Sequence, residues 1–309
     1  ADNEKALLDN IGNNSISLYI GIPFCPTRCV YCSFVSTDIR TSGKYMADFV
    51  DKLLLEIEKT GELVKKSGVY VENIYIGGGT PTTLSSEDFK RVMEKLYSCF
   101  DLSGLIEFTV EAGRPDTITK EKLDVLKKYG VNRISINPQS MNDKTLKKIG
   151  RSHSVDMIYV TYKMAKSVGF DVINMDLIAG LPDETTDEFK YSLNKVIELE
   201  PENITVHSLC IKRAARFRHT ENELAKAEDM TYPYDGELTK TIYNYLAETK
   251  RLTANWDVFN NAVMCGNYAQ LDTPANAKAQ LCQIIHLFDI YICGGLYGHN
   301  AANSIGLSG

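Results

Sequence analysis

The sequence lacks long blocks of like charge and long uninterrupted apolar runs. Its 34 basic and 40 acidic residues are interspersed and give a net charge of -6, which disfavours a nucleic-acid-binding surface. The first residues contain no apolar signal core, and the most apolar late stretch, residues 284–296, is interrupted by His286 and Asp289. We therefore expect a soluble, cytoplasmic protein with neither nucleic acid nor membrane as a partner.

The chain also lacks the cysteine density of a secreted disulfide scaffold, since its eight cysteines are spread unevenly over 309 residues. It shows no internal repeat, low-complexity tract or long Pro/Gly linker. Hydrophobic residues make up 44% of the chain, which is enough for an extensive core in one large domain with an appendage. Three of the eight cysteines nevertheless fall within eight residues, and this clustering is the first functional signal.

Short apolar runs alternate with longer amphipathic stretches between residue 17 and about residue 209, as in repeated strand-helix units around a parallel sheet. An amphipathic helix is expected over residues 44–65, and helix starts with capping hydroxyls are expected at Ser85 or Ser86 and at Thr119. The predicted strands are residues 18–20, 71–76, 106–111, 133–137, 172–178 and 203–206. Six units predict an α/β fold, an open (βα)6 partial TIM barrel with a C-terminal appendage.

The strand-helix rhythm is lost after residue 213, which suggests three regions. Residues 1–16 form an N-terminal extension, residues 17–213 the barrel, and residues 214–309 a C-terminal region that we expect to bind substrate. The best helix candidate in this last region is residues 237–246.

The clustered cysteines, Cys25, Cys29 and Cys32, form a C-x3-C-x2-C loop directly after the first predicted strand. Thiolates are the usual protein ligands of iron-sulfur clusters, and ordinary clusters take four. Three ligands leave one iron open to a ligand that is not protein. The alternatives are a Cys3His zinc site or simple packing, although the first histidine of the chain is His153. The other five cysteines are expected to pack or remain free thiols, with a second cluster in the tail as the alternative.

Residues suited to ligand binding stand at or near the ends of the later predicted strands, where the loops of a barrel converge on one mouth. The glycines allow the backbone to approach a ligand closely, although a simple tight turn is the alternative. The candidates are Gly77, Gly78, Gly79 and Thr80 after the second strand, Glu111 in the third, Gln139 after the fourth, Asp176 in the fifth and His207 after the sixth.

Glu111 and Asp176 occupy otherwise apolar strands, where a carboxylate is costly unless it is paired or bound to a ligand. Pairing with Arg133 or Arg114 is the structural alternative to cofactor binding. Arg151 can form a bidentate contact with a carboxylate, and a solvated position at a helix end is equally compatible with the sequence.

The run at residues 17–34, SLYIGIPFCPTRCVYCSF, resembles the radical S-adenosylmethionine (SAM) family of oxygen-independent coproporphyrinogen III dehydrogenases, especially its HemZ-type branch. The similarity covers residues 17 to about 214. Further matching segments are residues 77–81 (GGGTP), 111–116 (EAGRPD), 133–141 (RISINPQSM), 150–151 (GR) and 173–182 (INMDLIAGLP).

This resemblance implies that Cys25, Cys29 and Cys32 bind a [4Fe-4S] cluster, with Tyr19 close to the cluster-bound SAM and Tyr31 beside its adenine. It also implies that the triglycine segment holds the SAM amino group and that the strand-end side chains contact the amino-acid or ribose portions. The residues in question are Gly77, Gly78, Gly79, Thr80, Glu111, Gln139, Arg151 and Asp176. His207, Lys212 and Arg213 fit the pattern of the branch.

The reaction implied by the resemblance is reductive cleavage of SAM to a 5'-deoxyadenosyl radical. That radical then takes hydrogen from a propionate of coproporphyrinogen III, and loss of CO2 and one electron leaves a vinyl group. The implied partners are a tetrapyrrole or other small-molecule substrate and an electron donor such as flavodoxin or ferredoxin. The sequence departs from the family at Gly21, where many relatives carry His, and in the tail after residue 214. The alternatives are another radical SAM modification of a tetrapyrrole and a haem-binding chaperone.

Overall fold

The computed structural model describes residues 14–34 and 36–209. Within these ranges six parallel strands form one sheet in the order β1-β4-β5-β6-β7-β8, so that each strand is added beside the one before it in that order. The strands are β1 (Ser15–Ile22), β4 (Tyr70–Gly78), β5 (Glu107–Gly113), β6 (Arg133–Gln139), β7 (Val172–Ala179) and β8 (Asn203–Ser208). A second, two-stranded sheet pairs β2 (Phe24–Cys25) with β3 (Thr37–Asp38).

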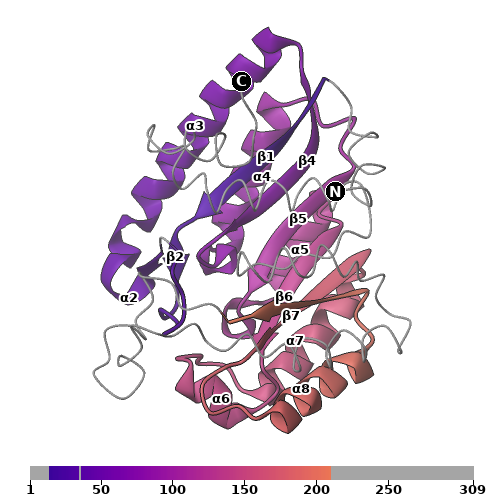
Figure 1. Ribbon diagram of the computed structural model, residues 1–309. Helices are drawn as coiled ribbons and strands as arrows, with labels where there is room; N and C mark the ends of the chain where they lie inside the picture. The colour runs from indigo at the N-terminus through magenta and orange to yellow at the C-terminus, as the bar shows by residue number, and fades with distance from the viewer. Residues whose placement is uncertain (1–13, 35, 210–309) are drawn as a thin grey trace, which may run out of the picture.

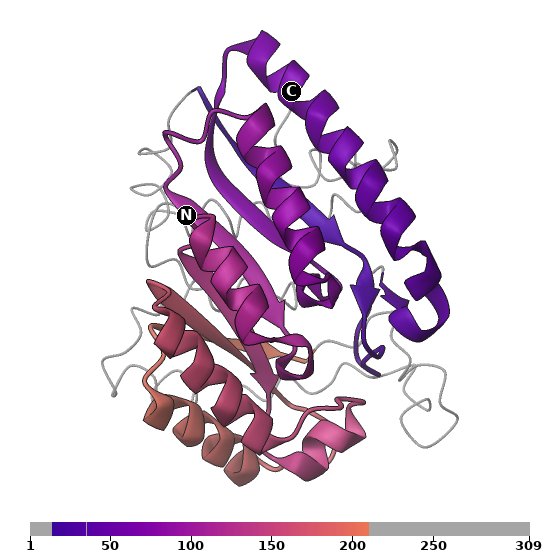
Figure 2. The ribbon, with the colours of Figure 1, turned by 180° about the vertical axis from the view of Figure 1, so that it is seen from behind.

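Five helices lie side by side across one face of the six-stranded sheet (Figure 2), and the opposite face is turned toward the viewer in Figure 1. Helical crossovers between parallel strands place the helices on the outside in this way. These helices are α3 (Met46–Ser67), α4 (Ser86–Cys99), α5 (Lys120–Lys128), α7 (Val155–Val168) and α8 (Thr186–Leu199). The remaining elements are α2 (Ile39–Ser42), α6 (Asp143–Lys148) and the 3-10 turns η1 (Gly43–Tyr45), η2 (Pro81–Thr83) and η3 (Pro115–Thr117). The predicted α/β open (βα)6 fold is confirmed.

Alternation of side chains along each strand gives the sheet an apolar and a polar face. In β4, Ile74 and Ile76 are buried in the core. The alternate residue Asn73 donates a hydrogen bond to Ser17 Oγ at 3.2 Å, and Tyr75 stacks on Tyr19 of β1. We call the face that carries Tyr19 and Tyr75 the inner face of the sheet.

The six predicted strands are all present, and each extends beyond the predicted range at one or both ends. Ser85 and Thr119 cap α4 and α5 as predicted, accepting hydrogen bonds from the backbone N–H of Asp88 and Lys122. Helix α3 begins at Met46 rather than at residue 44, because α2 and η1 occupy the preceding segment. Among the described helices none is long and apolar enough to cross a membrane. The boundary at residue 213 and the helix candidate at 237–246 lie outside the described residues.

Candidate cofactor site at the carboxyl ends of the strands

The cysteine loop runs from β2 to β3 and is closed at its base by their pairing. The backbone N–H of Thr37 donates to Pro23 O at 2.7 Å, and inside the loop the N–H of Cys32 donates to Cys29 O at 3.3 Å. Cys29 is buried, Cys25 and Cys32 are half-buried, and all three are free thiols. The loop therefore presents three sulfur donors from one short segment.

Burial raises the pKa of two of the loop cysteines, Cys25 and Cys32, and so favours their neutral thiol form. At Cys32, burial together with the charge of neighbouring cysteines raises the pKa to about 11. A hydrogen bond from Thr80 Oγ1 to Cys25 Sγ at 3.5 Å works in the opposite direction. Metal binding requires thiolates, so cationic iron would have to displace these protons.

The donor set has the chemistry that an iron-sulfur cluster requires. In the ranges 14–34 and 36–209 no three His, Cys, Asp or Glu side chains lie close enough to share one ion. A cube binds each thiolate through a different iron, so its sulfur ligands do not need to converge on one point. Three free thiols with no imidazole among them are also the soft ligands that iron-sulfur clusters prefer.

The triglycine segment lies directly against the backbone that carries the cysteine loop. The N–H of Gly79 donates to Ile22 O at 2.7 Å, and the N–H of Thr80 donates to Phe24 O at 2.8 Å. A Cβ on Gly78 would lie 2.9 Å from Ile22 N, and one on Gly79 would lie 2.7 Å from Phe24 O. Both distances are too short for a side chain, so glycine is required here for contact between backbones. A simple tight turn does not describe the whole segment, because Gly77 and Gly78 are the last residues of strand β4.

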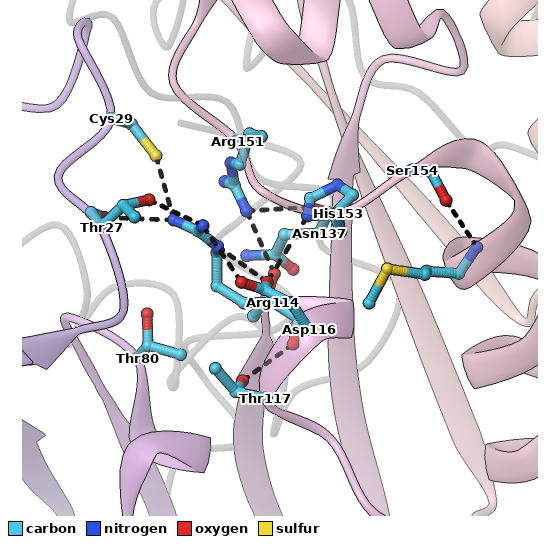
Figure 3. A network of polar contacts seen from close by, with 12 residues as sticks. Thr27, Cys29, Thr80, Arg114, Asp116, Thr117, Asn137, Arg151, His153 and Ser154 are labelled. Carbon is cyan, nitrogen blue, oxygen red and sulfur yellow. Dashed lines mark hydrogen bonds and ion pairs between the residues drawn. The ribbon is translucent and has the colours of Figure 1, made fainter.

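Arg114, from the end of β5, reaches the cysteine loop from a second side (Figure 3). Its Nη1 donates to Thr27 O at 3.1 Å and to Cys29 Sγ at 3.5 Å, and its Nη2 donates to Thr27 Oγ1 at 2.9 Å. Its Nε donates to Asp116 Oδ1 at 3.2 Å. Burial acts to raise the pKa of Asp116, but the imidazole of His153, whose Nδ1 lies 3.7 Å from Asp116 Oδ1, and the charge of Arg114 outweigh it and lower this pKa to about 2. Arg114 thus contacts Asp116 and the loop, and its expected alternative role as a partner of Glu111 or Asp176 is wrong.

The segment after α6 holds the loop from a third side. Thr27 Oγ1 donates to Gly150 O at 3.0 Å, and the N–H of Val30 donates to Ile149 O at 3.2 Å. The backbone after β4 and after α6, together with the Arg114 side chain after β5, therefore fixes the cysteine loop.

Arg151 follows directly and turns toward the loop, as Figure 3 shows for its guanidinium. Its Nη2 donates to Tyr31 OH at 2.9 Å, and its Nη1 donates to Asn137 O at 3.4 Å and Gly113 O at 3.5 Å. These contacts join β5, β6 and the cysteine loop. The alternative of a solvated arginine at a helix end is therefore wrong.

A group of aromatic and acidic side chains lies on the inner face beside the loop. The rings of Tyr19 and Tyr75 stack with centroids 5.8 Å apart and an interplanar angle of 10°. Tyr75 OH donates to Glu111 Oε1 at 2.6 Å. Burial, with a further contribution from the charge of Asp176, raises the pKa of Glu111 to about 7, although the hydrogen bond from Tyr75 acts to lower it. Glu111 can therefore hold or release a proton near neutral pH.

Asp176 extends this group across β7 and β8. Asn174 Nδ2 donates to Asp176 Oδ1 at 2.6 Å, and His207 Nε2 lies 3.7 Å from Asp176 Oδ2. The strand-end residues Glu111, Asp176 and His207 are thus neighbours, as expected for side chains at one mouth.

Gln139 ends β6 in an unusual backbone conformation. It is buried and has a φ of 72°, at a register shift of β6 against β7. Such a positive φ is uncommon outside glycine and often marks functional sites. Among residues 14–34 and 36–209 no side-chain hydrogen bond joins Gln139 to the groups described above, and Lys212 and Arg213 lie outside these ranges.

Two contributions were missed by reasoning from the sequence. Tyr75 stacks on Tyr19 and donates a hydrogen bond to Glu111. Because Ile74 and Ile76 on either side of it point into the core, the alternation along a strand could have placed Tyr75 on the inner face. Arg114 was considered only as a partner of strand carboxylates, and its actual target, Thr27, is 87 residues away in the chain.

Comparison with protein families matches residues 19–196 to the radical SAM superfamily. The oxygen-independent coproporphyrinogen-III oxidase-like protein HemZ of Bacillus subtilis is 46% identical over 211 residues, which is 68% of this chain and 42% of that protein. The heme chaperone HemW of Bacillus subtilis is 38% identical over 199 residues, which is 63% of this chain and 51% of that protein. Among solved structures, the coproporphyrinogen III oxidase HemN of Escherichia coli has a TM-score of 0.58 and 28% identity, covering 68% of this chain and 50% of that chain.

The chain spans about half the length of these curated relatives. The superfamily implies a [4Fe-4S] cluster and SAM as cofactors, and three free thiols on one anchored loop fit that cluster. Since the matched residues make up more than half of its 309 residues, the chain belongs to the radical SAM superfamily.

Proposed function

We propose that Cys25, Cys29 and Cys32 hold a [4Fe-4S] cluster and that the protein uses it to cleave SAM reductively. The observation that carries this proposal is the anchored loop, with three free thiols at the carboxyl edge of a parallel sheet. When bound, such a cluster would pass on one electron, received from an external donor, to break a C–S bond of SAM. The protein's own task is to orient SAM and exclude water.

The residues around the loop divide this task. Glu111 and Asp176 offer carboxylates to the polar groups of SAM, and Tyr75 orients Glu111 through its 2.6 Å hydrogen bond. Tyr31 packs beside the adenine, oriented by the hydrogen bond from Arg151. The other proposed SAM contacts are Tyr19, Gly77, Gly78, Gly79 and Gln139. Thr80 acts on Cys25 through its hydrogen bond to the sulfur.

For the substrate we propose coproporphyrinogen III, whose propionates would undergo oxidative decarboxylation to vinyl groups in haem biosynthesis. The supporting observation is similarity to the oxidase-like HemZ and the oxidase HemN. We assign substrate binding to residues 214–309 and electron supply to a flavodoxin or ferredoxin. A reducing cytoplasmic location would suit the free thiols and the oxygen sensitivity of such a cluster.

A haem chaperone is the second candidate, and another radical SAM modification of a tetrapyrrole is a variant of the first. The chaperone is favoured by the 38% identity to HemW. The two classes differ in a measurable way, because an oxidase consumes SAM and changes its substrate, whereas a chaperone binds haem and releases it unchanged.

The test uses the intact chain, reconstituted anaerobically with iron and sulfide. With a strong reductant and SAM, coproporphyrinogen III should accelerate 5'-deoxyadenosine formation and yield products lighter by the lost carboxyl groups, as read by mass spectrometry. SAM cleavage without acceleration or decarboxylation would reject the oxidase. Stoichiometric haem binding in a parallel titration would then favour the chaperone.

A further inference from the structure

Arg114 contacts both the backbone and a sulfur of the cysteine loop. We propose that Arg114 is a positioning residue that fixes the loop around Cys29 and that its buried positive charge makes the bound cluster easier to reduce. This inference rests on the proposed function in one respect, namely that Cys29 is a cluster ligand.

The positioning role follows from how the guanidinium grips Thr27. Nη1 donates to the main-chain oxygen of Thr27 and Nη2 to its hydroxyl, at 3.1 and 2.9 Å. A planar guanidinium can serve two acceptors at once in this fixed geometry, whereas the ammonium of lysine cannot. Thr27 lies between Cys25 and Cys29, so holding it in place restrains the backbone that carries both cysteines.

Arg114 is itself held rigidly. Its backbone N–H donates to Ala112 O at 2.6 Å, and its carbonyl accepts from the N–H of Thr117 at 2.9 Å in the turn η3. Asp116 accepts from Nε at 3.2 Å and from Nη2 at 3.4 Å. Only 3% of Arg114 is exposed, so the surrounding atoms restrict the guanidinium to this position.

The charge effect follows from which nitrogen faces the sulfur. Nη1 lies 3.5 Å from Cys29 Sγ, whereas the two nitrogens bonded to Asp116 are Nε and Nη2. Reduction adds one negative charge to a cluster, and a nearby buried cation stabilises the reduced form more than the oxidised form. Hydrogen bonds to ligand sulfurs are a recognised means of setting cluster potentials. Asp116 offsets part of this effect but lies on the far side of the guanidinium from Cys29.

The experiment compares the parent chain with Arg114→Gln, Arg114→Lys and the control Arg91→Gln. The control substitution Arg91→Gln removes the same positive charge from α4. Arg91 pairs with Asp51 and Asp88 and makes no contact with the cysteine loop. Each protein is reconstituted anaerobically, and its iron content is measured. The reduced cluster is then followed by electron paramagnetic resonance in a redox titration without SAM, so that the readout does not depend on activity.

In Arg114→Gln the ratio of reduced to oxidised cluster at a fixed potential should fall about tenfold, consistent with loss of a charge-assisted hydrogen bond. Tenfold in a one-electron couple corresponds to a midpoint lower by about 59 mV. Arg114→Lys should have a midpoint potential closer to that of the parent, because it keeps the positive charge. It should lose iron faster to a chelator, because lysine cannot make both hydrogen bonds to Thr27. Arg91→Gln should match the parent in both measurements.

A folded Arg114→Gln chain with parental iron retention and midpoint would overturn the proposal. If that variant folds by circular dichroism but binds no cluster, the positioning role is supported. The titration of Arg114→Lys then decides the charge effect, which is rejected if its midpoint lies about 59 mV below that of the parent although the charge is kept. A parent chain that assembles no cluster would overturn the proposed function and this inference together, and is recognised because all variants then behave alike.

Discussion

Replacing Glu111 by Gln should stabilise the protein at pH 8 and weaken its binding of SAM. Burial raises the pKa of Glu111 from 4.5 to about 7. The folded chain therefore keeps this proton up to about pH 7, whereas the unfolded chain loses it near pH 4.5. Because the unfolded state binds fewer protons between these values, the stability contributed by this residue is greatest below pH 4.5 and falls as the pH rises to 7. Above pH 7 the loss is complete.

The size of this effect follows from the two pKa values. Their difference, at about 1.4 kcal/mol for each pKa unit, corresponds to a destabilisation of up to about 3 kcal/mol at pH 8. Glu111 is half-buried rather than fully enclosed, so this figure is an upper limit. Gln cannot ionise and still accepts the hydrogen bond from Tyr75, so Glu111→Gln should recover most of the lost stability. Loss of a charged contact should reduce SAM affinity by about tenfold to a hundredfold.

Glu184 provides a matched control for the stability measurement. Burial raises its pKa to about 7 as well, and Ser140 Oγ donates to its Oε1 at 2.7 Å. It lies between β7 and α8, and Ser140 also contacts Ser192 of α8 at 3.3 Å. Glu184→Gln should therefore stabilise the protein at pH 8 to a similar extent and leave SAM affinity unchanged. The exposed Glu56→Gln on α3 should change neither quantity.

The assay is urea unfolding followed by far-ultraviolet circular dichroism between pH 5 and pH 8, with SAM titrations of the reconstituted proteins. Infrared spectra should show protonated carboxyl groups that titrate near pH 7 and are partly lost in each variant. If Glu111→Gln has the parental stability at pH 8, Glu111 is ionised without cost and the burial argument is refuted. If it is stabilised yet binds SAM normally, Glu111 is not a SAM contact.

Three further predictions test the loop and its surroundings. Changing any one cysteine of the loop to Ala should abolish cluster assembly, measured by iron content and absorption; normal cluster spectra in all three variants would exclude these ligands, which are Cys25, Cys29 and Cys32. Gly79→Ala should destabilise the protein by about 1–3 kcal/mol in thermal unfolding, because its Cβ would lie 2.7 Å from Phe24 O; an unchanged melting temperature would show that the backbones can separate freely. Tyr75→Phe should move the carboxyl titration of Glu111 to higher pH, since the lost hydrogen bond lowers that pKa; a shift to lower pH would contradict the assigned donor.

Local sequence patterns were sufficient to predict the strands and several helix ends. A strand with alternating side chains and a helix with one apolar stripe each depend on residues close together in the chain. The hydroxyls of Ser85 and Thr119 cap helices through backbone groups only three residues away. The carboxyl ends of parallel strands must share one edge, so the meeting of Glu111 with Asp176 was also predictable.

Contacts between distant segments were not predictable in the same way. Arg151 donates a hydrogen bond to Tyr31, which is 120 residues away in the chain, and Arg114 donates one to Thr27, which is 87 residues away. An arginine after a strand has many possible acceptors, and the choice depends on how the loops fold over one another. The sequence identified both arginines as suited to an anion. In the structure both contact the cysteine loop, through a carbonyl and hydroxyls and, for Arg114, a sulfur, and Arg114 also pairs with the carboxylate of Asp116.

The triglycine segment was recognised from the sequence, but the contact that requires its glycines was not. The sequence indicated that residues 77–79 lack side chains so that a ligand can approach, and this remains a prediction. In the structure the missing Cβ atoms of Gly78 and Gly79 are needed for a different contact, with the backbone at Ile22 and Phe24. That backbone leads directly into Cys25. The glycines therefore help to set the position of Cys25 whatever they bind, so a substitution here would disturb this proposed cluster ligand as well as any cofactor contact.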